Sequence, residues 1–330
     1  MTAIVTGASG FVGGAIVRRL LADGESVVAL VRSREAASKV SSLGADPVIV
    51  DLADTDASAR AMRGSETVFH VAGRNAMCPR RPEILHRDNV DLAVAVVRAA
   101  ADAGVGRVVH TSSAATLGEE AGEVGREDTT HRGWFLSPYE RSKYLGERAV
   151  LAAGRRLEMD VVVVNPCSVQ GPGRATGSAQ LLFRVARSRR PVLVRTWISV
   201  VDVDDCAAGH VLAARHGVPG ERYVLSGASL PVDEAFETLR AVTGGPRRVL
   251  WIPALALRAV APITALAGLG REDVDPLVCP AVVRALLHGH RYDGSRAAHE
   301  LGLRYRPLAE TLERTLAWAR LRDPRASDDG

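Results

Sequence analysis

The first 165 residues alternate between two patterns of apolar positions. Short runs rich in β-branched residues are typical of buried strands, and between them apolar residues recur every three or four positions, as on one face of a helix. The predicted strands cover residues 2–6, 26–31, 47–50, 67–71, 107–111 and 161–164. This regular alternation predicts an α/β fold built on a doubly wound parallel (Rossmann) sheet.

The first strand runs directly into a glycine-rich turn that ends at Gly13, and a helix pattern follows until Asp23-Gly24. A strand, a glycine turn and a helix together form the framework of a dinucleotide site. The glycines allow close backbone approach, and the pyrophosphate binds free amides at the start of the helix. A glycine turn without a ligand is the alternative. The residues predicted to contact a dinucleotide here are Gly7, Ser9, Gly10, Phe11, Val12 and Gly13.

The second predicted strand is followed by Arg32 and Ser33. An acidic residue at this point binds the ribose 2′-hydroxyl of NAD, whereas an arginine suits the 2′-phosphate of NADP. Arg32 and Ser33 therefore favour NADP(H), with NAD(H) and a merely solvated strand end as alternatives. The next two strands end at Asp51-Leu52 and Ala72-Gly73, which we expect to border the same cofactor, because ligands bind at the carboxyl ends of parallel strands.

Beyond residue 171 the alternation breaks down. Helices are predicted over 179–187, 206–215 and 308–321, and strands over 198–203, 222–225 and 247–252, with Asp204-Asp205 capping the middle helix. We expect residues 1–169 and about 197–216 to form the dinucleotide-binding domain. About 170–196 and 217–321 then form a smaller, mixed substrate domain, and 322–330 a disordered tail. The apolar stretch 253–270 is shorter than the roughly 20 residues of a membrane span, which favours a buried helix or a lid over a membrane-surface contact.

Composition describes an ordinary globular protein. The 330 residues are 47% hydrophobic, with a mean hydropathy of +0.04 and a net charge of +4. No basic stripe is interleaved with aromatic residues, so nucleic acid is not an expected partner. Since no basic, apolar segment precedes the first strand, we expect no secretory leader. The four cysteines Cys78, Cys167, Cys206 and Cys279 are far apart, which predicts reduced thiols, no metal site and a cytoplasmic location.

Candidate chemistry comes from Tyr139 and Lys143, which stand four apart on a predicted helix and so share a face. A nearby ammonium stabilises the phenolate and lowers the pKa of the phenol. Tyr139 is then the predicted proton donor or acceptor, and Lys143 also holds the ribose of the cofactor. Ser113, at the end of the fifth strand, is predicted to orient the substrate oxygen, with Thr111 and Ser112 as rivals for this role.

Taken together, these motifs resemble the extended short-chain dehydrogenases/reductases. The resemblance rests on the glycine turn, Asp51-Leu52, Ala72-Gly73, Thr111-Ser112-Ser113-Ala114, Tyr139-x-x-x-Lys143, Asn165-Pro166, Val203-Asp204-Asp205 and Leu301-Gly302-Leu303-x-x-x-Pro307. It implies an NAD(P) cofactor, catalysis by Ser113, Tyr139 and Lys143, and often a homodimer. It also implies that Asn89 is structural or part of a proton relay, and that Pro166 and Ser168 contact the cofactor.

Two branches of that family compete. Sugar-nucleotide epimerases usually have Tyr-Gly where this chain has Leu117-Gly118. The segment from Asn165 to Pro172 is more similar to dihydroflavonol reductases, 3β-hydroxysteroid dehydrogenases and hopanoid-associated sugar epimerases. We therefore expect NADPH-dependent reduction of a ketone or aldehyde on a medium-sized, partly apolar small molecule. The alternatives are an NAD-dependent nucleotide-sugar epimerase or dehydratase, and a non-catalytic NAD(P)-binding protein.

Substrate contacts are expected from three loop-rich stretches, residues 74–86, 117–136 and 167–190. Binding residues are often carried by loops that a rigid scaffold positions. Ordinary loop or core material is the alternative for each candidate. The candidates in these stretches are Arg74, His131, Trp134 and Gln170.

Overall fold

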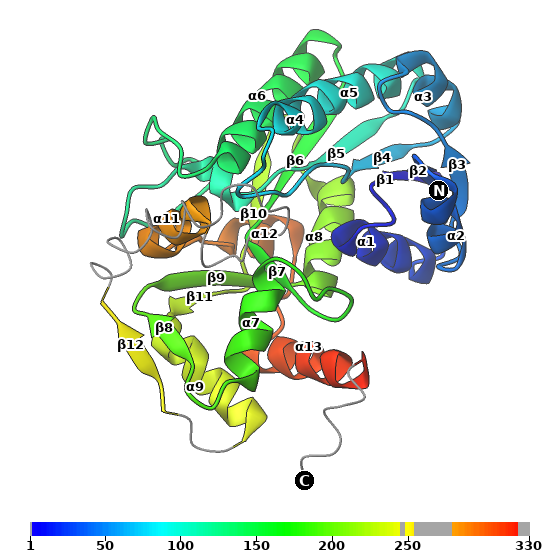
Figure 1. Cartoon of the computed structure of the whole chain (residues 1–330). Helices are drawn as coiled ribbons and strands as arrows, with labels where there is room; N and C mark the ends of the chain where they lie inside the picture. Colours follow the sequence, from blue (N-terminus) through cyan, green and yellow to red (C-terminus); the bar gives the residue numbers. More distant parts are fainter. Residues whose placement is uncertain (1, 245–247, 254–278, 323–330) are drawn as a thin grey trace.

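A seven-stranded parallel sheet forms the centre of the protein in the computed structural model, which describes residues 2–244, 248–253 and 279–322 (Figure 1). The strand order β10-β6-β5-β4-β1-β2-β3 runs outward from β1 in both directions, which confirms the doubly wound fold predicted from the sequence. The strands are β1 (Thr2–Thr6), β2 (Ser26–Val31), β3 (Asp46–Ile49), β4 (Thr67–His70), β5 (Arg107–Thr111), β6 (Asp160–Pro166) and β10 (Arg222–Leu225).

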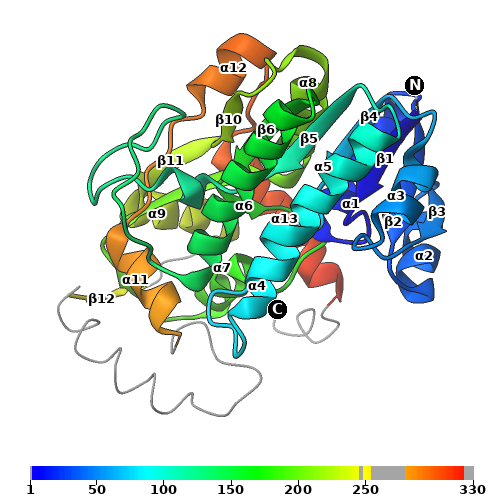
Figure 2. The ribbon, with the colours of Figure 1, turned by 90° about the horizontal axis from the view of Figure 1, so that it is seen from above.

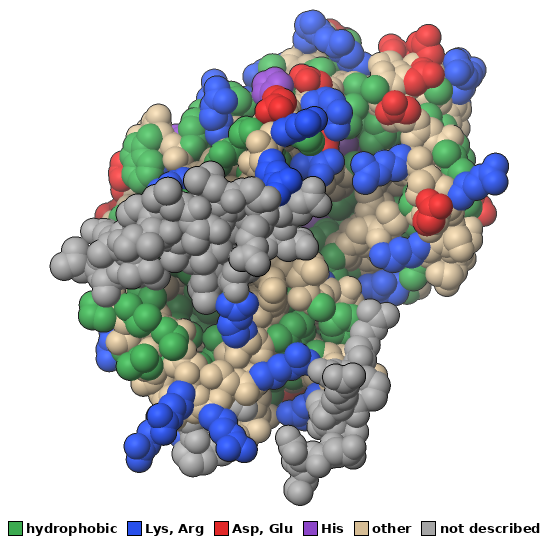
Figure 3. Space-filling model, in the orientation of Figure 1, with side chains coloured by type: hydrophobic (Ala, Val, Ile, Leu, Met, Phe, Trp, Pro, Cys, Tyr) green, Lys and Arg blue, Asp and Glu red, His purple; other side chains and the backbone are tan. Residues whose placement is uncertain are grey.

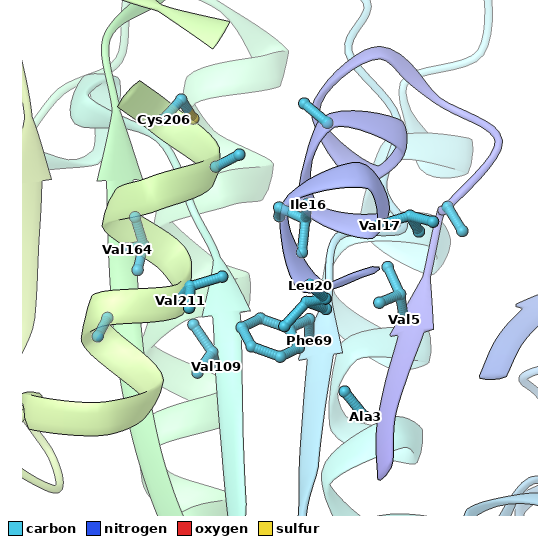
Figure 4. Close-up of a cluster of buried hydrophobic side chains, with 14 of the residues drawn as sticks. Ala3, Val5, Ile16, Val17, Leu20, Phe69, Val109, Val164, Cys206 and Val211 are labelled. Carbon is cyan, nitrogen blue, oxygen red and sulfur yellow. The ribbon is translucent and has the colours of Figure 1, made fainter. Parts of the chain in front are cut away.

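Helices cover both faces of this sheet, as the alternation of side chains along each strand requires (Figure 2). Ala3 and Val5 of β1 pack into one core with α1 and α8, whereas Ile4 packs into the other with α3, α5 and α6. Figure 4 shows the first core, with Phe69 of β4 lying near Leu20. The helices on the two faces of the sheet are α1 (Phe11–Ala22), α2 (Arg34–Ser41), α3 (Thr55–Met62), α5 (Leu92–Asp102), α6 (Pro138–Arg156) and α8 (Val203–His216).

The helical segment between β4 and β5 is divided into three parts in the structure. It consists of α4 (Glu83–His86), a π-helical turn (Arg87–Asp91) and α5. The wider turn carries Asn89, whose side chain is buried and fully used in hydrogen bonds within the site. π-helical turns of this kind are frequent at functional sites, and the apolar periodicity of the segment does not reveal the extra residue.

A smaller lobe lies beyond the carboxyl ends of β5 and β6. Cys167 separates β6 from β7, so the lobe begins at this edge of the sheet (Figure 1). Its helices α7, α9 and α13 share a small core around Phe183, Leu239 and Leu316. The elements outside the main sheet are β7 (Ser168–Gln170), α7 (Ser178–Arg187), β8 (Val192–Val194), β9 (Trp197–Asp202), β11 (Ala228–Pro231), α9 (Val232–Thr243), β12 (Leu250–Ile252), α11 (Pro280–His288), α12 (Ser295–Leu301) and α13 (Leu308–Arg322).

Two strands belong to other sheets than the predicted domain boundaries imply. Strand β9, expected within the dinucleotide domain, pairs with β7 and β11 in a three-stranded sheet of the smaller lobe. Strand β10, expected in the substrate domain, pairs with β6 and completes the main sheet. The helix cap also differs: Asp202, not Asp204-Asp205, caps α8, since its carboxylate accepts from the amide of Asp204 at 2.8 Å. Short runs do not reveal which neighbour they pair with.

The expectation that all four cysteines are reduced is wrong. Cys78, in the loop after β4, and Cys279, immediately before α11, form a disulfide across 201 positions of sequence. Cys167 and Cys206 are free thiols. Sequence spacing could not reveal the pair, because it is the fold that brings the two loops together.

The described residues contain no helix long and apolar enough to span a membrane. Except for Pro253, the apolar stretch 253–270 lies outside them, as does the tail after Arg322. On the face shown in Figure 3, Lys and Arg side chains are spread over both lobes, and many of the Asp and Glu side chains lie toward the α3 end of the sheet.

Candidate active site

The backbone around the turn between β1 and α1 requires glycine at two positions, Gly7 and Gly13. Gly7 has a φ of +68°, and a methyl group there would lie 2.6 Å from the amide nitrogen of Ala72. A methyl group at Gly13 would lie 2.2 Å from the carbonyl oxygen of Gly7. Gly10 begins α1 without a side-chain cap, so no side chain occupies the amides of the first helical turn. These features fit a dinucleotide pyrophosphate, as predicted.

The end of β2 lies beside this turn, because Leu30 pairs with Thr6. Arg32 follows as an exposed side chain, while the Ser33 hydroxyl caps α2 by accepting from the amide of Ala36 at 3.2 Å. A further cation, which the sequence analysis missed, reaches the turn from α2. Lys39 Nζ donates to the carbonyl oxygen of Ser9 at 2.5 Å.

The two other strand ends lie where a cofactor above the sheet would pass. Ala72 lies against Gly7 and donates its amide to Thr6 Oγ1 at 3.2 Å. A methyl group at Gly73 would lie 3.0 Å from Asn89 Oδ1 and 3.8 Å from Lys143 Nζ, so close approach to the backbone again requires glycine. Asp51 and Leu52 follow β3, with Asp51 Oδ1 accepting from the amide of Ala53 at 3.0 Å.

Helix α6 carries Tyr139 in its first turn. Ser137 caps the helix by accepting from the amide of Glu140 at 3.0 Å, and Pro138 follows at the first helical position. This start fixes Tyr139 beside the end of β5, where the Ser113 side chain is close enough to lower the pKa of its phenol. The structure thus brings together two of the three side chains expected to carry the chemistry.

Lys143 lies one turn further along α6 and is buried. Its Nζ donates to the carbonyl oxygen of Thr111 at 2.7 Å. Burial lowers the pKa of Lys143 from 10.5 to about 8, and the carboxylate of Glu147 acts in the opposite direction. The side chain is therefore held between β5 and Gly73, where the ribose of a cofactor could be bound.

A cation that the sequence analysis did not identify acts on Tyr139. Burial raises the pKa of Tyr139, while the hydrogen bond with Ser113 and the positive charge of Arg174 lower it. The sequence analysis assigned this electrostatic role to Lys143. Arg174 lies in the loop between β7 and α7, and its guanidinium stacks on Phe11, 5.8 Å from the ring centroid.

The rivals of Ser113 have other partners. Ser112 Oγ donates to Glu147 Oε2 at 2.5 Å, and Thr111 Oγ1 lies 2.9 Å from Nε2 of the buried His210. Of the three, Ser113 is the residue whose side chain lowers the pKa of Tyr139, and its Oγ also accepts from the amide of Ala115 at 3.3 Å. The geometry therefore favours Ser113.

Glu147 is a buried carboxylate that connects several side chains around these residues by hydrogen bonds. Its Oε2 accepts hydrogen bonds from three side chains, and its Oε1 lies 3.1 Å from Arg222 Nη1. The three donors to Oε2 are Ser112 Oγ at 2.5 Å, Thr116 Oγ1 at 2.8 Å and Asn165 Nδ2 at 2.7 Å. Sequence reasoning missed Glu147, although its position four residues after Lys143 places it on the same helical face.

Asn89 fixes the opposite side of the site. Its Oδ1 accepts from the amide of Arg74 at 2.8 Å, and its Nδ2 donates to the Arg74 carbonyl at 3.0 Å and to Ser142 Oγ at 2.9 Å. A methyl group at Gly146 would lie 2.1 Å from the Asn89 carbonyl oxygen. Asn89 therefore joins the loop after β4 to α6, which is a structural function.

Two of the four substrate candidates, Arg74 and His131, have partners within the protein. Arg74 Nε donates to Asp88 Oδ2 at 2.6 Å. His131 Nδ1 accepts from the amide of Gly133 at 2.9 Å, and its ring packs at a tilt against the rings of Phe135 and Tyr144.

The other two candidates also have protein partners. Trp134 is 49% exposed and lies under the guanidinium of Arg132. Gln170 Nε2 donates to Ser168 Oγ at 3.1 Å and to Ser178 Oγ at 2.9 Å. Of the other cofactor candidates, Pro166 is buried at the end of β6, and Ser168 begins β7. These assignments remain predictions.

Comparison with known proteins identifies the family. The model of the NAD-dependent epimerase/dehydratase family matches residues 3–226. The chain is 33% identical over 327 residues to a putative dihydroflavonol 4-reductase of Synechocystis, covering 95% of this chain and 93% of the relative. It is 30% identical over 338 residues to sterol demethylase protein B of Methylococcus capsulatus, covering 98% and 99%.

A solved structure gives the same result. The crystal structure of gox2253 superimposes with a TM-score of 0.83 at 30% identity, covering 97% of this chain and 98% of that one. Other relatives include both ketoreductases and a UDP-glucose 4-epimerase. The resemblance to extended short-chain dehydrogenases/reductases is thus confirmed, and the chain belongs to the NAD-dependent epimerase/dehydratase family of NAD(P)-dependent enzymes.

Proposed function

We propose that this protein is an NADPH-dependent carbonyl reductase that acts on a ketone or aldehyde of a medium-sized, partly apolar molecule. The observation that carries the proposal is the grouping of Ser113, Tyr139 and Lys143 at the end of β5, beside a glycine turn that fits a dinucleotide. Lys143 Nζ lies 2.7 Å from the Thr111 carbonyl oxygen, and Ser113 is close enough to Tyr139 to lower its pKa. A phenol and a hydroxyl that meet in this way can both contact one carbonyl oxygen.

Each side chain has a distinct role in this proposal. The Ser113 hydroxyl donates a hydrogen bond to the substrate oxygen and orients the carbonyl. Tyr139 gives its proton to that oxygen, and Arg174 stabilises the phenolate that remains. The bound nicotinamide supplies the hydride. Lys143, held by the Thr111 carbonyl at 2.7 Å, binds the ribose hydroxyls.

The preference for NADPH rests on the charges beside the turn. Arg32 is exposed directly after β2, and Lys39 contacts the turn at the Ser9 carbonyl. No carboxylate occupies position 32 or 33, where NAD-binding sites hold the ribose 2′-hydroxyl. Two cations close to this point favour a 2′-phosphate.

The proposed substrate class follows from the names of the relatives. The two relatives aligned above are named for a dihydroflavonol and a sterol, and others are named as reductases of a farnesyl-bearing oxo-quinoline and of 2-alkyl-3-oxoalkanoates. These names share a carbonyl or alcohol group on a largely apolar body. We propose the same class for this enzyme.

The test is a spectrophotometric scan of a panel of ketones and aldehydes with NADPH and with NADH. We expect oxidation of NADPH with apolar ketones and a higher kcat/KM for NADPH than for NADH. Equal use of the two cofactors would contradict the argument from Arg32. Arg32→Gln should reduce the preference for NADPH, and Arg98→Gln on the exposed face of α5 is the matched control.

The alternatives give different results in the same experiment. A nucleotide-sugar epimerase or dehydratase would retain NAD through purification and consume no NADPH. A non-catalytic binding protein would bind NADPH without turning over any member of the panel. The homodimer and the cytoplasmic location remain predictions, and the disulfide removes the argument that cysteine spacing gave for a reducing compartment.

A further inference from the structure

A carboxylate and two imidazoles meet outside the proposed catalytic site. Glu119 lies in the loop that follows the 3-10 turn Ala114–Leu117, His288 is the last residue of α11, and His290 follows two residues later. Each residue offers one ligand atom, and the three atoms lie within 4.8 Å of one another. The fold brings together segments that are about 170 positions apart in the sequence.

Several polar atoms converge on His290. Its Nδ1 lies 2.6 Å from Glu119 Oε1 and 2.8 Å from the hydroxyl of Tyr292. His288 Nε2 lies 3.6 Å from the same Oε1 and 3.1 Å from the Glu119 carbonyl oxygen. A single imidazole nitrogen carries at most one proton. His290 Nδ1 therefore cannot donate a separate hydrogen bond to both Glu119 Oε1 and the Tyr292 hydroxyl.

The Glu119 carboxylate is buried, and one of its two oxygens needs a further partner. The Glu119 side chain is 1% exposed and that of His288 is 4% exposed, yet Glu119 Oε2 is buried without any hydrogen-bond partner. A buried carboxylate oxygen with no partner is costly and requires a donor or a cation. His290 is 22% exposed, which leaves a route from solvent to the cluster.

We propose that Glu119, His288 and His290 bind one divalent cation of the zinc class. Two imidazoles and one carboxylate form a ligand set that zinc adopts with a fourth, exchangeable position. Ligand atoms of a tetrahedral zinc site are about 3.3 Å apart, given bond lengths of about 2.0–2.2 Å. Glu119 Oε1 lies 2.6 Å from His290 Nδ1 and 3.6 Å from His288 Nε2, on either side of this value, and all three ligand atoms lie within 4.8 Å of one another. Small side-chain shifts therefore suffice to form the site.

The cation would join two segments that flank the proposed catalytic groups. Tyr292 packs against Ala114 and Leu117, directly after Ser113. The Glu119 carbonyl also accepts from Arg132 Nη1 at 3.1 Å, and the guanidinium of Arg132 pairs with Glu140, the neighbour of Tyr139. Metal binding at the cluster therefore holds the loop 117–136 against the segment after α11. The role is structural, and it does not depend on the proposed reductase activity.

The test measures metal content and affinity in the full chain. The purified protein is treated with EDTA, dialysed, and titrated with ZnCl₂ against a chromogenic chelator, with CaCl₂ as a second titrant. We expect one tightly held Zn²⁺ per chain, no comparable binding of Ca²⁺, and a higher melting temperature with zinc. Glu119→Gln and His290→Gln should each weaken zinc binding by about 100-fold or more.

Matched controls separate this cluster from adventitious binding. Glu120→Gln changes the exposed neighbour of Glu119, and His299→Gln changes an exposed histidine on α12, so both should bind zinc like the unaltered chain. If the unaltered chain binds no stoichiometric zinc, or if Glu119→Gln binds it equally well, the proposal is wrong. The zinc-induced rise in melting temperature of the unaltered chain keeps the test decisive should a ligand variant fold poorly.

Discussion

The guanidinium of Arg174 lies 5.8 Å from the ring centroid of Phe11, at the start of α1, and its charge also lowers the pKa of Tyr139, at the start of α6. One side chain from the smaller lobe thus joins the cofactor turn to the proposed proton donor. Since burial raises the pKa of Tyr139, this cation offsets part of the cost of forming the phenolate.

Removing this charge should shift the pH dependence of catalysis. In the alcohol-oxidising direction the phenolate accepts the proton, so the rate rises with pH up to the pKa of Tyr139. Arg174 lowers that pKa, so Arg174→Met should raise it and move the rising limb of kcat/KM to higher pH. Arg189→Met, an exposed substitution after α7, is the control. A rising limb that stays in place would show that Arg174 does not act on Tyr139.

The glycine turn gives a test of cofactor binding. Gly13→Ala would place a methyl group 2.2 Å from the Gly7 carbonyl oxygen, so the turn must open and NADPH affinity should fall by about tenfold or more. Gly14→Ala is the matched control, because its methyl group would meet no atom closer than 3.4 Å. Fluorescence titration with NADPH measures both variants, and equal affinities would count against the assigned pyrophosphate site.

Glu147→Gln should destabilise the protein. The substitution replaces one acceptor oxygen of a buried hub with a donor, leaving one of its hydrogen bonds unmade and Arg222 without its charged partner. Leaving buried donors unsatisfied costs about 1–3 kcal/mol. The midpoint of urea unfolding should therefore fall, while the exposed Glu123→Gln leaves it unchanged. If Glu147→Gln unfolds at the same urea concentration as the unaltered chain, the hydrogen bonds of Glu147 do not stabilise the fold.

The disulfide should contribute to stability. Removing a native disulfide typically costs about 2–5 kcal/mol, and the contribution increases with the length of the loop that it closes. Cys78→Ser should therefore lower the melting temperature, and dithiothreitol should lower that of the unaltered chain to a similar value. Dithiothreitol should have no further effect on Cys78→Ser. If neither treatment changes the melting temperature, the bond between Cys78 and Cys279 does not stabilise the fold.

Local patterns predicted much of this architecture. Six strands of the main sheet lie within a residue or two of the predicted ranges, because β-branched runs mark buried parallel strands clearly. Ser113 follows the end of β5 and Tyr139 lies in the first turn of α6, as the predicted elements require, while their catalytic roles stay predictions. The spacing of Tyr139 and Lys143 placed them on one face of α6, as the structure shows.

The remaining features depend on long-range contacts that no local pattern encodes. Arg174 meets Tyr139 only because the loop after β7 folds back over the turn. Cys78 forms a disulfide with Cys279 across 201 positions. Glu119 and His288 are also far apart in the sequence and lie side by side only in the folded protein. The pairing of β10 with β6 is likewise set by the crossover through α8, and four residues are too few to show it. Glu147 is the exception, since its spacing on α6 could have revealed it.

The central claim is that the Tyr139 hydroxyl transfers the proton during carbonyl reduction. The most direct measurement compares NADPH oxidation by the unaltered enzyme and by Tyr139→Phe with the best ketone of the panel, alongside NADPH affinity for both. We predict that kcat falls by about 10²–10⁴-fold in Tyr139→Phe, as for the loss of a general acid, while the Kd for NADPH stays nearly constant. An unchanged kcat would contradict the account.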